Sequence, residues 1–223
     1  MRQVAHPGAA GRAGRWVAVA PERLSGWLDR FAAGHGGLAG STVDTGELVL
    51  AAVDGTSAGI RVPFPPLAVD PADPYGGLVA HALAERRVGV LLVRLGGYAA
   101  GIAEGDRLVA SKVGSRQVHG RSAAGGQSQQ RFARRREGQV RVALAAAADT
   151  AAAVLVPAVP TLDAVVLGGD RRATDDVLAD PRLAPLRPLA VQQRLDVPDP
   201  RLKVLQGTPA LFRAVRIRIT DPG

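Results

Sequence analysis

The chain has 223 residues, 47% of them apolar, and a mean hydropathy of +0.07. This composition can fill the core of one substantial domain or of two small ones, which excludes a disordered chain. Because the sequence has no cysteine, disulfides and thiolate metal sites are excluded, and no structural zinc is expected. The most apolar stretch, residues 143–160, is interrupted by charged and proline residues, so we expect no membrane span. The N-terminus lacks the continuous apolar stretch of a signal peptide, and we expect a cytoplasmic protein.

The formal net charge of +8 is concentrated in one segment. Residues 107–141 contain nine basic residues and one acid, Glu137, whereas the rest of the chain contains nineteen of each sign. A general preference for arginine explains many of these residues, but it does not explain their clustering. Since such a dense positive segment attracts polyphosphate backbones, we expect a nucleic acid as partner.

The N-terminal part predicts a tail, a strand and a helix. Residues 1–14 are rich in glycine and alanine and are expected to form a flexible tail. Residues 15–20 are typical of a strand. A helix is predicted from Pro21, because apolar side chains recur at helical spacing until the glycines at 34–37 end it.

A hairpin and a proline-rich connector follow. Residues 47–53 and 58–64 flank an Asp-Gly-Thr-Ser turn and are predicted to pair. Five prolines between 63 and 74 form a stiff connector. We therefore expect a small α+β portion over 15–75 and a second domain over 76–223.

The second domain is predicted to alternate strands with helices, which indicates an α/β fold with a mixed β-sheet flanked by helices. Its most distinctive part is an irregular basic loop at 115–127 that leads into a long helix ending near residue 156. The helices are predicted at 75–86, 127–156, 171–179 and 200–206, and the strands at 88–95, 98–103, 107–114, 163–167, 189–195 and 212–220, the first three as a meander.

The usual catalytic patterns are missing from the sequence. The four histidines, at positions 6, 35, 81 and 119, lack metal-ligand spacing, and the adjacent Asp175 and Asp176 face different sides of their helix. Gly168-Gly169-Asp170 follows a strand and precedes a helix, but it lacks the further residues of a nucleotide-binding loop. We interpret it as a structural turn and expect neither a metal nor a cofactor.

The tripeptide Gly125-Gly126-Gln127 lies where the basic loop meets the long helix. In the first turns of that helix, Arg131, Arg134 and Arg135 are spaced at i, i+3 and i+4, which gives one stripe suited to phosphates. A merely solvated helix face would interleave acids with these arginines. Here only Glu137 does so, which favours a nucleic-acid interface.

The string GGQSQQRFARRR, residues 125–136, is similar to the GGQSxxRFARxR signature in the catalytic middle domain of eukaryotic and archaeal class-one peptide release factors. His119-Gly120-Arg121 resembles the basic approach to that loop, and residues 162–183 are similar to the strand, turn and helix that follow. The resemblance covers about residues 88–196. Because the chain is short and lacks codon-reading and factor-binding domains, it more closely resembles the stand-alone actinobacterial peptidyl-tRNA hydrolases of the Vms-like release factor family.

This resemblance implies a middle-domain fold with RNase H-like layering and a monomer that releases nascent chains from stalled large ribosomal subunits in ribosome-associated quality control. Gly125 and Gly126 would let the loop enter the peptidyl-transferase centre. Gln127 has no titratable group, so its role would be to place water against the peptidyl-tRNA ester and to stabilise the oxyanion. The residues expected to contact tRNA or ribosomal RNA are Lys112, Arg116, His119, Arg121, Ser128, Arg131, Arg134, Arg135 and Arg136.

Two alternatives remain open. A nuclease that removes the tRNA 3′ CCA end would also free the nascent chain, and the scarcity of carboxylates disfavours only its metal-dependent form. A non-catalytic RNA- or ribosome-binding module is the second alternative. The chain has only eight aromatic residues, and Phe132 is the only one in the basic segment, which argues against a base-stacking platform.

Overall fold

The computed structural model describes residues 14–44, 47–67, 70, 73, 75–115 and 127–222. The chain divides into two compact units, which we call the N-terminal unit (residues 1–84 and 213–223) and the central unit (residues 85–212). Most of the expected tail, residues 1–13, lies outside the described residues. The last strand belongs to the N-terminal unit, although it was predicted from the sequence to lie in the second domain.

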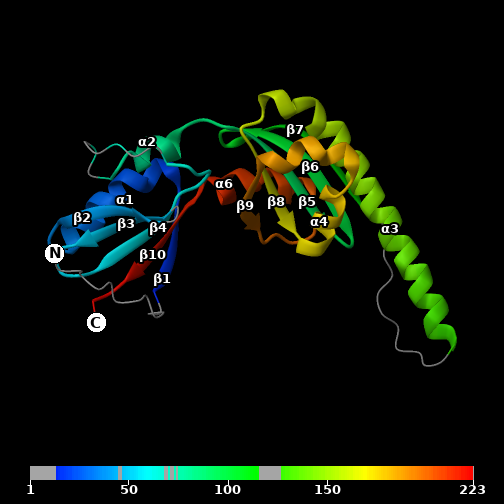
Figure 1. Ribbon diagram of the computed structural model, residues 1–223, viewed down its shortest axis with the longest axis horizontal. Helices are drawn as coiled ribbons and strands as arrows, with labels where there is room; N and C mark the ends of the chain where they lie inside the picture. Colours follow the sequence, from blue (N-terminus) through cyan, green and yellow to red (C-terminus); the bar gives the residue numbers. More distant parts are fainter. Residues whose placement is uncertain are drawn as a thin grey trace, which may run out of the picture. The chain divides into compact units, whose positions relative to one another are not determined.

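The N-terminal unit contains one antiparallel sheet of five strands (Figure 1). Helix α1 packs on one face of this sheet, and α2 contacts α1. In sheet order the strands are β1 (Arg15–Val19), β10 (Val215–Thr220), β4 (Ser57–Arg61), β3 (Glu47–Ala52) and β2 (Leu38–Asp44), and the helices are α1 (Pro21–Gly34) and α2 (Leu78–Leu83).

The core of this unit explains why the last strand joins it. In β10, Val215 and Ile217 are buried and alternate with exposed arginines, so the strand has one apolar face. That face joins Leu28 of α1 and Ile60 of β4 in one cluster, and β10 bonds to both β1 and β4. The predicted first strand, first helix and hairpin are confirmed. Strand β2 was not predicted, because its sequence LAGSTVD lacks apolar alternation.

The central unit contains a mixed five-stranded sheet in the order β7-β6-β5-β8-β9. The first three strands form the predicted antiparallel meander, and β5, β8 and β9 run parallel. This order, with the second strand antiparallel to the first, is that of an RNase H-like domain, and it confirms the predicted fold class. The strands are β5 (Arg87–Arg94), β6 (Gly97–Glu104), β7 (Arg107–Ser115), β8 (Ala164–Gly169) and β9 (Ala190–Leu195).

The longest helix, α3 (Gln127–Leu155), lies between β7 and β8 in the chain. Helix α4 (Arg171–Leu178) lies between β8 and β9. Two 3₁₀ segments, η1 (Val156–Thr161) and η2 (Pro181–Leu189), lie mostly between the predicted elements. Both are proline-rich, and proline lacks the N–H that continues an α-helix. Helices α5 (Leu202–Gln206) and α6 (Thr208–Arg213) complete the fold, and α6 ends just inside the range predicted as the last strand.

The core of the central unit lies between α3 and the sheet. Ala147, Ala148 and Ala151 of α3 are buried with Ala100 of β6 and Leu167 of β8. Their small side chains let the helix lie close to the strands. Side chains of α4 and η2 join the same cluster, so these elements cover the same face of the sheet as α3.

By length and mean hydropathy (1.9), residues 134–161 could cross a membrane, although no membrane span was expected from the sequence. The packing of α3 accounts for this composition. One face of the helix is buried in the core of the central unit, and on its exposed side Asp149 accepts a hydrogen bond from Arg182 at 2.7 Å. A helix that covers the sheet of an α/β domain combines these same features.

The Gly-Gly-Asp sequence is a strand end and a helix cap, as interpreted. Gly169 ends β8 with φ of +91°, and a Cβ added there would lie 2.3 Å from the carbonyl oxygen of Val93. Asp170 then caps α4, because its Oδ1 accepts a hydrogen bond from the Ala173 N–H at 2.8 Å. Gly169 is therefore required by the close approach of β8 to the end of β5.

We predict opposite effects for two glycine-to-alanine substitutions. Gly169→Ala should lower the free energy of unfolding by about 2–4 kcal/mol, because it adds backbone strain and a clash. Gly138→Ala should raise it by up to about 1 kcal/mol, because Gly138 lies inside α3 with no atom near the added methyl group. Urea denaturation followed by circular dichroism measures both. Equal effects of the two substitutions would contradict a special backbone requirement at Gly169.

Candidate functional site

The N-terminal part of α3 projects from the body of the central unit (Figure 1). Within the described stretch 134–142 no side chain is buried, and burial begins at Ala143. Because an α-helix rises about 1.5 Å per residue, Gln127 lies about 24 Å along the helix axis from Ala143. We call residues 127–142 the arm. It holds its first residue well away from the sheet.

Gln127 is the first residue of α3. The first four N–H groups of a helix have no acceptor within the helix, and this end carries partial positive charge. The backbone of Gln127 is therefore available to an anion or oxyanion. Gly125 and Gly126 lie outside the described residues, as do Arg116, His119 and Arg121, and for Ser128 and Arg131 only the helical backbone is described.

The structure separates the three consecutive arginines of the arm. Arg134 and Arg135 are exposed, whereas Arg136 is half-buried and lines a groove beside α4. This difference follows from helical spacing, because Arg136 lies seven residues before the core-facing Ala143 and shares its side of the helix. Arg134 and Arg135 thus remain suited to phosphates, and Arg136 borders a different surface.

Lys112 adds positive charge at the edge of the central sheet. It lies on the edge strand β7 directly opposite Ala100 of β6 and is exposed. Since residues directly opposite each other share a sheet face, and Ala100 belongs to the core under α3, Lys112 lies on the face that α3 covers. Arg141 is exposed on α3 itself. Exposed basic side chains are thus described both at the sheet edge and on the arm.

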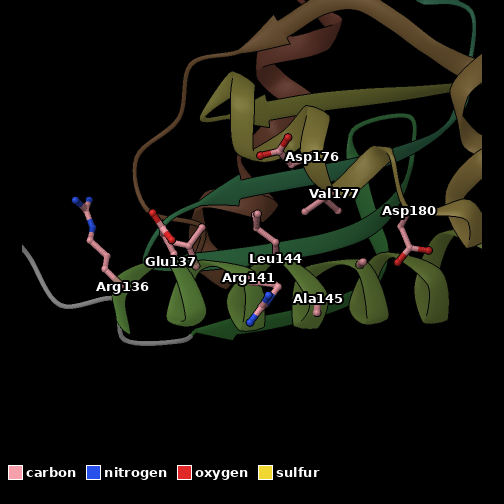
Figure 2. Close-up of a pocket in the computed structure, with 10 residues that line it drawn as sticks. Arg136, Glu137, Arg141, Leu144, Ala145, Asp176, Val177 and Asp180 are labelled. Atoms are coloured by element: carbon pink, nitrogen blue, oxygen red, sulfur yellow. The ribbon is translucent and has the colours of Figure 1, made fainter. Parts of the chain in front are cut away.

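A groove of about 620 Å³ lies between α3 and α4 (Figure 2). Its wall includes apolar side chains, and charged groups of both signs surround them, so it lacks the character of a phosphate cradle. The groove could not be predicted from the sequence because its two walls are distant along the chain. The lining residues are Arg136, Glu137, Val140, Arg141, Leu144, Ala145, Ala148, Asp176, Val177 and Asp180.

Asp180, at the end of this groove, is held as a carboxylate by Arg182. The guanidinium donates hydrogen bonds to Oδ1 at 3.0 Å and to Oδ2 at 2.8 Å, and the Arg182 backbone N–H donates to Oδ1 at 2.9 Å. These bonds lower the pKa of Asp180 to about 2. Asp180 is therefore ionised at neutral pH and serves to fix η2 rather than to transfer protons. Among the residues described, no group of three His, Asp or Glu side chains could hold a metal ion.

Residues 86–218 match the family model described as the Actinobacteria/chloroflexi VLRF1 release factor. The chain belongs to this family. The match spans more than half of the sequence and includes the whole arm. It confirms the release-factor resemblance that the motif at 125–136 indicated, whereas the roles of the individual site residues stay predictions. Among curated proteins, none matches the sequence significantly.

Three solved structures are similar to this VLRF1 family member over part of its length. The archaeal translation termination factor aRF1 is 19% identical with a TM-score of 0.45, and the match covers 57% of this chain and 36% of that one. The Vms1 mitochondrial localization core is 9% identical with a TM-score of 0.40, covering 77% and 76%. Pelota from Archaeoglobus fulgidus is 13% identical with a TM-score of 0.31, covering 90% and 64%. The chain thus matches little more than a third of the archaeal termination factor.

We predict that Asp180→Asn destabilises the protein at neutral pH and has no effect near pH 2. The folded pKa of about 2 lies below the ordinary value of 3.8, so the stabilisation is present above pH 4 and is lost as the pH falls towards 2. Asparagine keeps the Oδ1 acceptor that caps η2 but removes the charge and the Oδ2 acceptor of the Arg182 guanidinium. Urea midpoints of both proteins between pH 2 and 7 measure the effect, and a constant difference across this range would contradict it.

Proposed function

We propose that this VLRF1 family member is a peptidyl-tRNA hydrolase that frees nascent chains from stalled large ribosomal subunits in ribosome-associated quality control. The observation that supports the proposal is the position of Gln127, which opens α3 at the end of a basic arm that has no buried side chain in its described part, residues 134–142. A narrow arm of this kind can carry its tip into a confined RNA-lined site while the sheet stays outside. We further propose that the protein acts as a monomer in the cytoplasm.

In the proposed reaction, a water oxygen attacks the carbonyl carbon of the ester that joins the peptide to the tRNA 3′ oxygen. The tetrahedral intermediate then collapses, the C–O bond to the tRNA breaks, and the 3′ oxygen takes a proton. The products are a peptide carboxylate and a tRNA with an intact 3′ hydroxyl. The Gln127 side chain orients the water. The backbone N–H of Gln127, which has no acceptor within the helix because it lies in the first turn, stabilises the developing oxyanion or leaving oxygen.

Binding is assigned to the basic residues around Gln127. Among the described side chains, Lys112, Arg134 and Arg135 are exposed and available to phosphates. We assign the same role to Arg116, His119, Arg121, Ser128 and Arg131 on the strength of the sequence motif. Much of the catalytic environment would then come from ribosomal RNA and the tRNA itself.

We predict that Gln127→Ala lowers the rate of peptide release on the order of 100-fold, because water is no longer positioned. Gln127→Pro should lower the rate by a further factor of about 10²–10³, because it also removes the N–H, while proline is well tolerated at the first position of a helix. The assay uses large subunits that carry labelled peptidyl-tRNA. Gln130→Ala, in the same helical turn, is the matched control and should release peptide normally.

The same assay separates the alternatives when the tRNA ends are analysed. An intact 3′ end that can be charged again supports the hydrolase, whereas a shortened tRNA would assign the protein to the nucleases. Release by Gln127→Ala at the wild-type rate would contradict the proposal. No release by any form would leave the non-catalytic RNA-binding module.

Arg134→Gln and Arg135→Gln should weaken binding to the large subunit without altering the fold. Each lost phosphate contact should reduce the slope of log affinity against log salt concentration by about 0.7–0.9. Arg172→Gln, an exposed arginine of α4, is the control and should leave the slope unchanged. Equal slopes for all three variants and the wild type would contradict a phosphate-binding role of the arm.

A further inference from the structure

The sheet of the N-terminal unit has a second face, opposite the one that packs on α1. Trp16 of β1 lies on this face directly opposite Arg218 of β10, and Arg216 lies opposite Arg61 of β4. We call these four residues the Trp16 face. Trp16 is 38% exposed, and all three arginines are exposed. No described residue of this unit forms a layer over them.

Three guanidinium groups surround the Trp16 ring. The distances from the guanidinium carbon to the ring centroid are 4.8 Å for Arg61, 5.3 Å for Arg216 and 5.9 Å for Arg218. Cation–π attraction and the aliphatic stems of the arginines hold the indole in place. The Trp16 indole is therefore held between positively charged groups and remains partly exposed to solvent.

Carboxylates compensate only part of this charge. Glu47 of β3 lies 3.7 Å from the Arg218 guanidinium and extends across Gly59, where an added Cβ would meet its carboxylate at 2.3 Å. Among the described residues, Arg61 and Arg216 form no ion pair. Glu47 also lies directly opposite Arg61 in the strand register, so one carboxylate faces three guanidinium groups and the face keeps a net positive charge.

We propose that the Trp16 face binds single-stranded RNA, with a base stacked on Trp16 and phosphates held by Arg61 and Arg216. An open β-sheet that presents an aromatic ring among cations is a common platform for unpaired bases. The positive charge selects a polyanion over a neutral or basic protein surface. This site lies in the N-terminal unit and does not require the arm or Gln127.

The small number of aromatic residues in the sequence argues against a base-stacking platform, but that number does not show which ring lies among cations in the folded protein. The Trp16 face is assembled from β1 and β10, near the two ends of the chain, and from β4 at residues 57–61, so no local motif contains it. Its arginines also lie outside the basic segment 107–141, in the part of the sequence whose charges balance overall. Strand register brings them together beside the indole.

Tryptophan fluorescence tests the proposal directly, because the chain contains only two tryptophans, Trp16 and Trp27. In the full-length Trp27→Phe variant, Trp16 is the sole reporter, and a single-stranded oligouridine of about twelve nucleotides, within the length range of common single-strand sites, should quench it in a saturable way. The control is Trp16→Phe, in which Trp27, stacked on Phe31 at 5.6 Å, should not be quenched. Absence of Trp16 quenching would overturn the proposal, and this result does not depend on the folding of any Trp16 variant.

Substitutions then assign the contacts. Trp16→Ala should weaken oligouridine binding about five- to 150-fold, and Arg61→Gln and Arg216→Gln should each reduce the salt slope by about 0.7. In the Trp27→Phe background, Arg134→Gln/Arg135→Gln should keep the quenching, which separates this site from the arm. If Trp16→Ala lost binding to the large subunit while its oligouridine affinity stayed unchanged, the face would bind a protein, and the RNA proposal would be wrong.

Discussion

The packing of the alanine-rich half of α3 on the central sheet is the constraint on which the rest of the structure depends. Ala147, Ala148 and Ala151 are almost completely buried, so the helix lies close to the strands and its direction is fixed. An isolated helix as short as the arm is marginal in water. The arm continues directly from the packed half of α3, and that half supplies the helix nucleus that an isolated segment of this length would lack. The same contacts that form the core therefore determine where Gln127 is presented.

Most of the central unit could be predicted from the sequence because its elements carry strong local signals. Strands β5, β6 and β7 are separated by tight glycine turns, and α3 has both high helix propensity and a clear start. Strand β2 escaped prediction because small and polar residues give it no period. The location of β10 escaped because it depends on pairing with strands more than 150 residues earlier in the chain, and such register has no local signal.

The candidate site also has some features that the sequence indicates and others that only the structure shows. A linear motif points to Gln127 and the arginines that follow it as candidates. The motif did not distinguish Arg136 from Arg134 and Arg135, because that difference depends on which side of α3 meets the sheet and α4. Surfaces formed by distant segments, such as the groove and the Trp16 face, left no sequence pattern at all. Candidate residues that follow one another along one helix can thus be named from the sequence, whereas surfaces assembled from several elements cannot.

The chemistry of the described side chains also limits where the reaction could take its protons. Gln127 does not titrate near neutral pH, and Asp180, the carboxylate near the arm whose pKa is most clearly shifted, stays ionised down to about pH 2. Tyr75, whose pKa burial and Asp29 raise to about 12, belongs to the other unit. Gln127, Asp180 and Tyr75 are therefore not suited to act as a general base. In the proposed hydrolysis, Gln127 contributes orientation and hydrogen bonds that do not change with pH, so any pH dependence should come from other groups around the ester.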